Sequence, residues 1–145
     1  MFFVRGYFTV TLIELYADGA SRSNPGPSGI GVAIYIDGSE IHTISEYIGE
    51  ATNNEAEYLA VIKGLEYLLD KNELSVSCYL DSKLVVEQAK GNYRVSAKNL
   101  KPFNKQLLSI VEQFNHIGFY HIPREKNSRA DELANKGIDS YEGFK

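Results

Sequence analysis

One cysteine, no tryptophan, four prolines and no long apolar run limit what this 145-residue chain can be. Cys78 has no disulfide partner within the chain, and its place in an apolar run predicts a small buried side chain in a protein of the reducing cytoplasm. Without an apolar segment of bilayer length, we expect no association with a membrane. Arg5 and Gly6 interrupt the aromatic residues at 1–8, and no small-residue cleavage site follows. This stretch therefore predicts a short N-terminal extension, not a signal peptide.

A basic excess is also missing, because the formal net charge is −4. General nucleic-acid binders usually carry positive charge, so this balance argues against such a protein unless grouped acids hold cations. Hydrophobic residues make up 43% of the chain, enough for the buried core of a single domain. We expect that domain to span 1–145, with its core at about 10–138 and a short C-terminal tail. No internal repeat, low-complexity run or linker divides it.

The order of periodic segments predicts an α/β fold. Strands are expected over 12–18, 29–36 and 40–49, then a helix from Thr52, a strand over 75–81, helices over 83–90 and 100–114, a strand over 117–122, and a helix from Ser128. Asp37-Gly38 predicts a hairpin turn, and Thr52 with Glu55 matches a capping box. Leu107, Leu108, Val111 and Phe114 define the apolar face expected for the helix over 100–114. The result is a five-stranded mixed sheet flanked by helices, with three antiparallel strands first and two later strands parallel to the first.

Four acids stand out: Asp18 and Asp81 where strands are expected to end, and Glu57 and Asp131 near helix starts. Each also has a structural explanation. Asp18 and Asp81 can begin turns, Asp131 can cap with Ser128, and Glu57 can pair with a lysine. Strand ends of open α/β sheets nevertheless collect ligands, so the fold brings the four acids together.

Four converging carboxylates repel one another unless cations relieve the charge. An oxygen-only ligand set favours Mg²⁺, with Mn²⁺ as a substitute, over zinc. Two such ions about 4 Å apart are a common device for in-line phosphodiester cleavage. Two divalent ions also offset four carboxylates, so an acidic protein can still hold a polyanion.

The acids lie in motifs that follow one another over nearly the whole chain, from Leu12 to about Ile138. These motifs are Tyr16-Ala17-Asp18-Gly19-Ala20 with Asn24-Pro25-Gly26-Pro27, Thr52-Asn53-Asn54-Glu55-Ala56-Glu57, Asp81-Ser82, and Arg129-Ala130-Asp131-Glu132-Leu133-Ala134. In this order they resemble type 1 ribonuclease H. Each motif alone is weak, but the set is highly specific.

The resemblance implies a ribonuclease H-like fold and an endonuclease that cuts the RNA strand of an RNA–DNA hybrid, leaving 5′-phosphate and 3′-hydroxyl ends. It makes the four acids the ligands of two Mg²⁺ ions. Asn24, Asn53 and Asn54 become minor-groove contacts that sense 2′-hydroxyls, the groups that distinguish RNA from DNA. Thr52 takes the family's phosphate-gripping position, which is compatible with its capping role.

The chain departs from many bacterial members, which carry a basic, tryptophan-rich protrusion. In its place stand Lys83, Lys90, Arg94, Lys98, Lys101 and Lys105, with Tyr93 among them. These residues form either a solvated helix face or contacts to backbone phosphates, and the latter predicts modest, salt-sensitive binding. We expect no separate hybrid-binding domain within these residues.

A second departure concerns the auxiliary residue, because Arg124 stands in a short loop where many members place a mobile histidine. We expect Arg124 to grip a phosphate, whereas its plain alternative is an exposed ion pair with Glu125 or Glu132. His121 is of a residue type that can shuttle protons, but it should be held in its strand.

Two other functions compete with a hybrid-cleaving, monomeric enzyme. A non-catalytic nucleic-acid-binding module is disfavoured because all four acids are present. A DNA-directed nuclease of the same fold, such as a junction resolvase, is disfavoured by Thr52-Asn53-Asn54 and Asn24-Pro25-Gly26.

Overall fold

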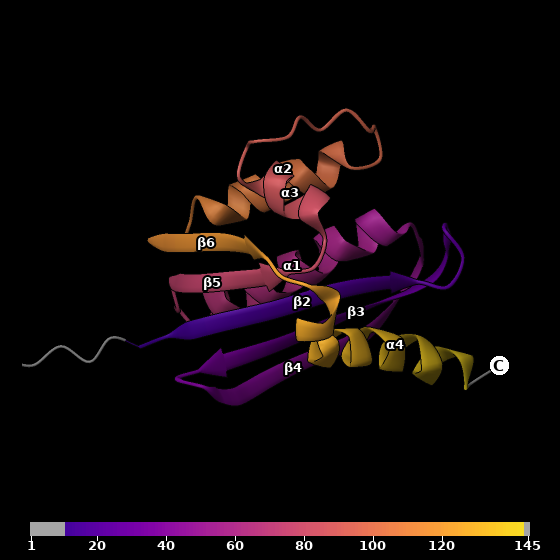
Figure 1. The fold of residues 1–145 in the computed structure, drawn as a ribbon, viewed down its shortest axis with the longest axis horizontal. Helices are drawn as coiled ribbons and strands as arrows, with labels where there is room; N and C mark the ends of the chain where they lie inside the picture. Colours follow the sequence, from indigo (N-terminus) through magenta and orange to yellow (C-terminus); the bar gives the residue numbers. More distant parts are fainter. Residues whose placement is uncertain (1–10, 144–145) are drawn as a thin grey trace, which may run out of the picture.

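A computed structural model describes residues 11–143 and contains one five-stranded sheet (Figure 1). The strands lie in the order β4-β3-β2-β5-β6. Their bounds are β2 Ile13–Ser21, β3 Gly26–Ile36, β4 Ser39–Ala51, β5 Ser75–Leu80 and β6 His116–His121. β2, β3 and β4 pair antiparallel, while β5 runs parallel to β2 and β6 parallel to β5. The expected mixed sheet is therefore confirmed. The N-terminal extension expected at 1–8 lies outside the described residues.

Helices cover both faces of this sheet. They are α1 Asn53–Asp70, α2 Lys83–Ala89, α3 Lys101–Val111 and α4 Ser128–Glu142, with a short 3-10 turn at Arg124–Lys126. In Figure 1, α1 lies behind β2 and β3, and α4 crosses in front of β3 and β4. None of the helices in the described part of the chain is long and apolar enough to cross a bilayer.

The two large helices approach the sheet closely because glycines remove side chains from the contacts. A Cβ added to Gly64 of α1 would come within 2.7 Å of a Leu15 methyl carbon. A Cβ on Gly31 of β3 would collide with the Ala130 carbonyl oxygen of α4. This close approach sets Asp131, the next residue along α4, beside β2.

The core fills the space between the sheet and α1, α2 and α3. Thr52 and Glu55 form the expected capping box at the start of α1. Cys78 is buried, as expected. One expectation is wrong: Leu108 is 40% exposed, and Ile110 takes the buried place with Leu107. The buried face of α3 is therefore rotated about the helix axis relative to the face that the apolar pattern predicted.

The expected end of the first strand is also wrong, because β2 continues past Asp18 to Ser21. Its parallel pairing with β5 ends at Ala17 and Leu80, whereas its antiparallel pairing with β3 goes on to Ser21 and Ser28. Asp18 and Asp81 are thus the residues that follow the last parallel pair. A strand bordered by two partners can leave one of them and remain paired with the other.

Candidate active site

Three carboxylates meet where β2 and β5 part. Asp18, Glu57 and Asp81 each offer an oxygen within 4.8 Å of the others. Asp18 and Asp81 come from adjacent parallel strands, and Glu57 comes from the start of α1, which packs across β2. Asp18 and Glu57 are 6% and 8% exposed. The fold therefore brings together three of the four acids that the sequence predicted.

Polar groups of the chain orient these carboxylates. The backbone N–H of Gly19 donates to Oε1 of Glu57. Nδ2 of Asn127 donates to Oδ2 of Asp81 at 3.2 Å and to the carbonyl oxygen of Ala17 at 2.9 Å. Asn127 is 1% exposed and caps α4, and its Oδ1 has no hydrogen-bond partner among the described residues. Asn127 was not among the residues predicted from the sequence, where its signal is an asparagine at a helix start four residues before Asp131.

Burial and mutual repulsion disfavour the charged forms of these acids. Desolvation is the main cause that raises the pKa of Asp18 to about 7, and the charges of Asp81 and Asp131 raise it further, while a hydrogen bond from Glu57 opposes them. The pKa of Glu57 is well above its usual value, first because of burial and then because of Asp18. A divalent cation would reverse both shifts, since it favours carboxylate over carboxylic acid. The donor set, all carboxylate oxygens, fits a hard cation such as Mg²⁺ or Mn²⁺.

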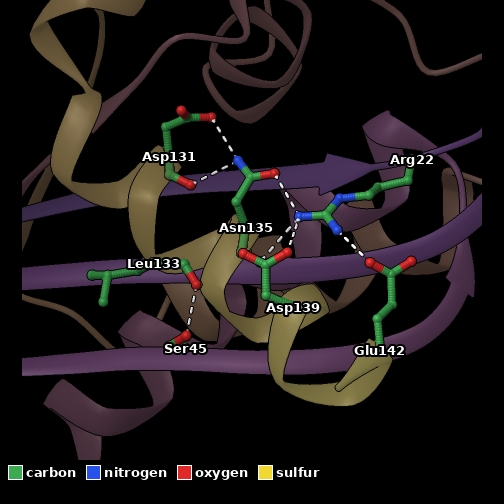
Figure 2. Close-up of polar contacts among 7 residues, drawn as sticks. All are labelled: Arg22, Ser45, Asp131, Leu133, Asn135, Asp139 and Glu142. Carbon is green, nitrogen blue, oxygen red and sulfur yellow. Dashed lines mark hydrogen bonds and ion pairs between the residues drawn. The ribbon is translucent and has the colours of Figure 1, made fainter. Parts of the chain in front are cut away.

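Asp131 lies at the border of this group and is only partly buried. It is not one of the three acids within 4.8 Å of one another, but it lies close enough to Asp18 for its charge to raise the pKa of Asp18. Nδ2 of Asn135 donates to Oδ1 of Asp131 at 3.3 Å (Figure 2). The capping alternative with Ser128 is wrong, because Asn127 is the N-cap of α4 and no side chain caps there.

The acids line a depression of about 200 Å³. Its lining residues are Asp18, Gly19, Asn53, Asn54, Glu57, Asp81, Ser82 and Arg124. Arg124 therefore lies at the site, and no ion pair joins it to Glu125 or Glu132 in the described chain, where Glu132 pairs with Arg129 at 3.1 Å. His121 is exposed at the end of β6 and is not one of the lining residues.

The three asparagines of the expected substrate contact lie beside the acids. The backbone N–H of Asn53 donates to Oδ1 of Asn24 at 3.0 Å, and Oδ1 of Asn53 accepts from the N–H of Ser21 at 3.0 Å. Asn54 lines the depression and is exposed. Thr52 Oγ1 accepts from the N–H of Glu55 at 3.1 Å in the capping box. Hydrogen bonds of Asn24 and Asn53 thus hold the β2–β3 loop against the start of α1. A ligand that contacted these residues would meet a surface whose two segments are held together.

Lys83 opens α2 directly after Ser82, whose Oγ accepts from the N–H of Val85 at 3.2 Å. The other basic residues of the expected phosphate contact continue along α2, α3 and the loop between them, and all are exposed. In Figure 1 these two helices and their loop stand beyond β6, on the side of the molecule away from α4. These basic residues therefore lie together on one side of the acidic site.

Comparison with known proteins shows that this chain is similar to nucleases. A model of the family described as reverse transcriptase-like matches residues 16–137. The Mycobacterium tuberculosis protein named Bifunctional protein Rv2228c is 38% identical over 130 residues, which cover 88% of this chain and 36% of that protein. Ribonuclease H of Pseudomonas fluorescens (strain Pf0-1) is 33% identical over 153 residues, covering 94% of this chain and 97% of that protein. The chain thus spans about a third of the mycobacterial relative.

A solved structure agrees with these matches. LC11-RNase H1, isolated from compost by a metagenomic approach, superposes with a TM-score of 0.84 at 45% identity over 90% of this chain and 97% of its own. A second crystal structure of LC11-RNase H1, in complex with RNA/DNA hybrid, gives a TM-score of 0.84 at 44% identity over 89% of this chain and 98% of its own.

Proposed function

Because the chain belongs to the type 1 ribonuclease H family, we propose that it is an endonuclease that hydrolyses the RNA strand of RNA–DNA hybrids. Cleavage leaves 5′-phosphate and 3′-hydroxyl ends. The observation that carries the proposal is the meeting of Asp18, Glu57 and Asp81 within 4.8 Å, where β2 and β5 part. A relative at 44% identity was crystallised with RNA/DNA hybrid, which supports this substrate.

Asp18, Glu57, Asp81 and Asp131 would hold two Mg²⁺ ions, for which Mn²⁺ can substitute. When bound, such ions would supply Lewis acidity and would stabilise charge on the attacking and leaving oxygens. The chain provides ligands that are already oriented, since Gly19 fixes Glu57 and Asn127 fixes Asp81.

Arg124 has an electrostatic role in this proposal. Its guanidinium stays protonated and therefore cannot act as a base, but it can donate two hydrogen bonds to a phosphate. It lines the same depression as the acids. A phosphate held there would lie beside the carboxylate group, and charge that develops on its oxygens would be stabilised.

In this proposal, three asparagines beside the acids recognise the RNA strand. Asn24, Asn53 and Asn54 would contact 2′-hydroxyls and base edges in the minor groove, and Thr52 a backbone phosphate. Lys83 and the basic residues of α2 and α3 would hold the phosphates of the hybrid further from the cleavage point. A single domain, a monomeric state and a cytoplasmic location stay predictions.

One cleavage panel tests the proposal. Labelled RNA–DNA hybrid, duplex DNA and duplex RNA are each incubated with the protein in Mg²⁺, in Mn²⁺ and in EDTA, with Asp18→Asn as the inactive control. We expect hybrid cleavage with either cation and none in EDTA. Binding of the hybrid without cleavage would show a non-catalytic module, and equal cleavage of duplex DNA would show a DNA-directed nuclease.

A further inference from the structure

Asp131 is joined to Arg22 by polar contacts along one face of α4 (Figure 2). Nδ2 of Asn135 donates to Oδ1 of Asp131 at 3.3 Å and to its backbone oxygen at 3.0 Å. Arg22, which follows β2, donates from Nη2 to Oδ1 of Asn135 at 3.3 Å and to the backbone oxygen of Asn135 at 3.3 Å. The guanidinium also pairs with Asp139 at 2.8 Å and Glu142 at 2.5 Å.

The two neighbours of Asn135 permit only one orientation of its amide. A guanidinium donates and never accepts, whereas an ionised carboxylate accepts and never donates. Oδ1 of Asn135 must therefore face Arg22, and Nδ2 must face Asp131. Without Arg22 the amide oxygen would lose its partner and the amide could turn more freely, with only the two bonds from Nδ2 to Asp131 to hold it.

The orientation of the Asp131 carboxylate depends on a hydrogen-bond donor more than that of the other acids does. Glu57 and Asp81 accept hydrogen bonds from Gly19 and Asn127, but Asp131 is partly exposed and faces the repulsion of Asp18. An aspartate side chain has several staggered rotamers, and repulsion between like charges favours those that move the Asp131 carboxylate away from Asp18. The amide of Asn135 opposes that movement with a charge-assisted hydrogen bond.

We propose that Asn135 is a positioning residue that keeps the Asp131 carboxylate turned toward the metal site, and that Arg22 keeps Asn135 in the required orientation. The inference rests on the proposed function, because it takes Asp131 as a metal ligand. It assigns a task to two residues outside the carboxylate group.

A merely structural role would come from the ion pairs of Arg22 and from the bond of Asn135 Nδ2 to the Asp131 backbone oxygen. The side chains of Asp139 and Glu142 are 67% and 37% exposed, and exposed pairs contribute little to stability. The hydroxyl of Ser45 makes a separate contact, donating to the Leu133 carbonyl oxygen at 2.6 Å, and anchors α4 to β4 without touching this chain of contacts (Figure 2). The structural and positioning roles can therefore be separated by mutation.

The test begins with Asn135→Ala and Arg22→Met. For Asn135→Ala we expect kcat on the hybrid to fall about tenfold, equal to about 1.4 kcal/mol, with KM nearly unchanged. The half-saturating Mg²⁺ concentration should rise several-fold. Arg22→Met should show the same pattern more weakly, because Asn135 remains and only its orientation is lost.

A double-mutant cycle shows whether Arg22 acts through Asn135. If it does, the double variant Arg22→Met with Asn135→Ala is no worse than Asn135→Ala alone. Additive losses would mean that Arg22 has an independent role and would overturn that half of the proposal.

Three variants serve as matched controls. Asp139→Asn and Glu142→Gln remove the ion pairs but keep the contact between Arg22 and Asn135, so kcat and the Mg²⁺ dependence should stay at the wild-type level. Ser45→Ala should lower Tm in EDTA without moving the Mg²⁺ dependence. If these controls reproduce the effect of Asn135→Ala, the contacts only dock α4 and the proposal is wrong.

Binding of Mn²⁺, followed by electron paramagnetic resonance without substrate, gives a readout independent of activity. Asn135→Ala should weaken it, while Tm in EDTA stays close to that of the wild type. Unchanged Mn²⁺ binding in Asn135→Ala overturns the positioning role and leaves the proposed function standing. A wild-type protein that binds no Mn²⁺ and cleaves no hybrid overturns the proposed function, and the positioning role with it.

Discussion

Asp18 and Glu57 are buried and lie next to each other, an environment that disfavours ionised carboxylates. Burial is the main cause of the raised pKa of both. The same two residues line the depression of the candidate site. The metal-free protein therefore bears an electrostatic cost that a bound cation would relieve, and this cost depends on pH.

The first prediction concerns stability against pH in EDTA. The folded-state pKa of Asp18 is about 7, above its ordinary value of 3.8, so between these values the folded protein holds a proton that the unfolded chain has released. The free energy of unfolding should therefore fall as pH rises from about 4 to about 7, by about 1.4 kcal/mol per pH unit for each such proton. Urea unfolding at intervals of half a pH unit measures this slope.

Asp18→Asn is the control for this slope, since the amide keeps the shape and does not titrate. The variant should be at least as stable as the wild type at pH 7, and its stability should depend less on pH over the same window. Addition of Mg²⁺ at pH 7 should stabilise the wild type but have little effect on the variant. A wild type that gains stability from pH 4 to pH 7 in EDTA would contradict the assignment.

Arg124 and His121 compete for the auxiliary role, and the geometry separates them. Arg124 lines the depression, whereas His121 ends β6 outside it. We expect Arg124→Ala to lower kcat about tenfold or more, a transition-state effect of at least about 1.4 kcal/mol. His121→Ala should change kcat much less. Steady-state kinetics on a hybrid substrate decides the matter, and the reverse order of effects would transfer the role to the histidine.

At the scale of elements, the site depends on how closely α4 approaches β3. The backbone of Gly31 faces the Ala130 carbonyl oxygen and the Ala134 nitrogen with no room for a Cβ. α4 carries Asn127 and Asp131, and both reach residues of β2 or β5. A small outward shift of α4 would therefore loosen two contacts of the site together.

Gly31→Ala tests this dependence. We expect a loss of stability of about 1–3 kcal/mol from overpacking, together with a lower kcat because Asp131 and Asn127 move away from β2. Gly143→Ala is the matched control, since a Cβ there meets only carbonyl oxygens at 3.4 Å and 3.7 Å and the backbone is helical. Thermal unfolding and cleavage rates measure the two effects. Loss of stability with an unchanged kcat would show that the site tolerates the shift.

At the scale of the whole molecule, a chain of net charge −4 is expected to bind a polyanion. The acids gather at one place, where divalent cations would offset them, and the lysines and arginines of α2, α3 and their loop stand to one side (Figure 1). The chain has no larger basic protrusion to add to this surface. Affinity should therefore rest on few phosphate contacts and fall with salt.

This surface predicts the salt dependence of hybrid binding. With Asp18→Asn to prevent cleavage, the slope of log Kd against log salt should decrease by about one for each contacting cation that is removed, Lys83 included. Lys71→Ala is the control, because Lys71 lies at the opposite end of α1 from Glu57 and should leave the slope unchanged. Fluorescence anisotropy over a range of NaCl concentrations provides the measurement. An unaltered slope for Lys83→Ala would remove Lys83 from the interface.

Features that depend on neighbours along the chain could be predicted from the amino-acid sequence. The capping box at Thr52 and Glu55, the hairpin at Asp37-Gly38 and the apolar faces of strands and helices follow from local chemistry. Together with the rule that helical crossovers join parallel strands, they led to the sheet. Asp18, Glu57 and Asp81 could be named because the local pattern placed each of them near an end of an expected strand or helix.

Features that depend on contacts between distant segments became visible only in the folded protein. β2 runs past Asp18 because β3 goes on pairing with it after β5 has ended. Asn127 is a site residue because α4 lies close enough for its amide to reach Ala17 and Asp81. Arg22 and Asn135 are 113 residues apart in the chain, and no spacing rule links a residue after a strand to the middle of the last helix. Such pairings depend on how whole helices and strands pack against one another, because that packing sets the distance between donor and acceptor.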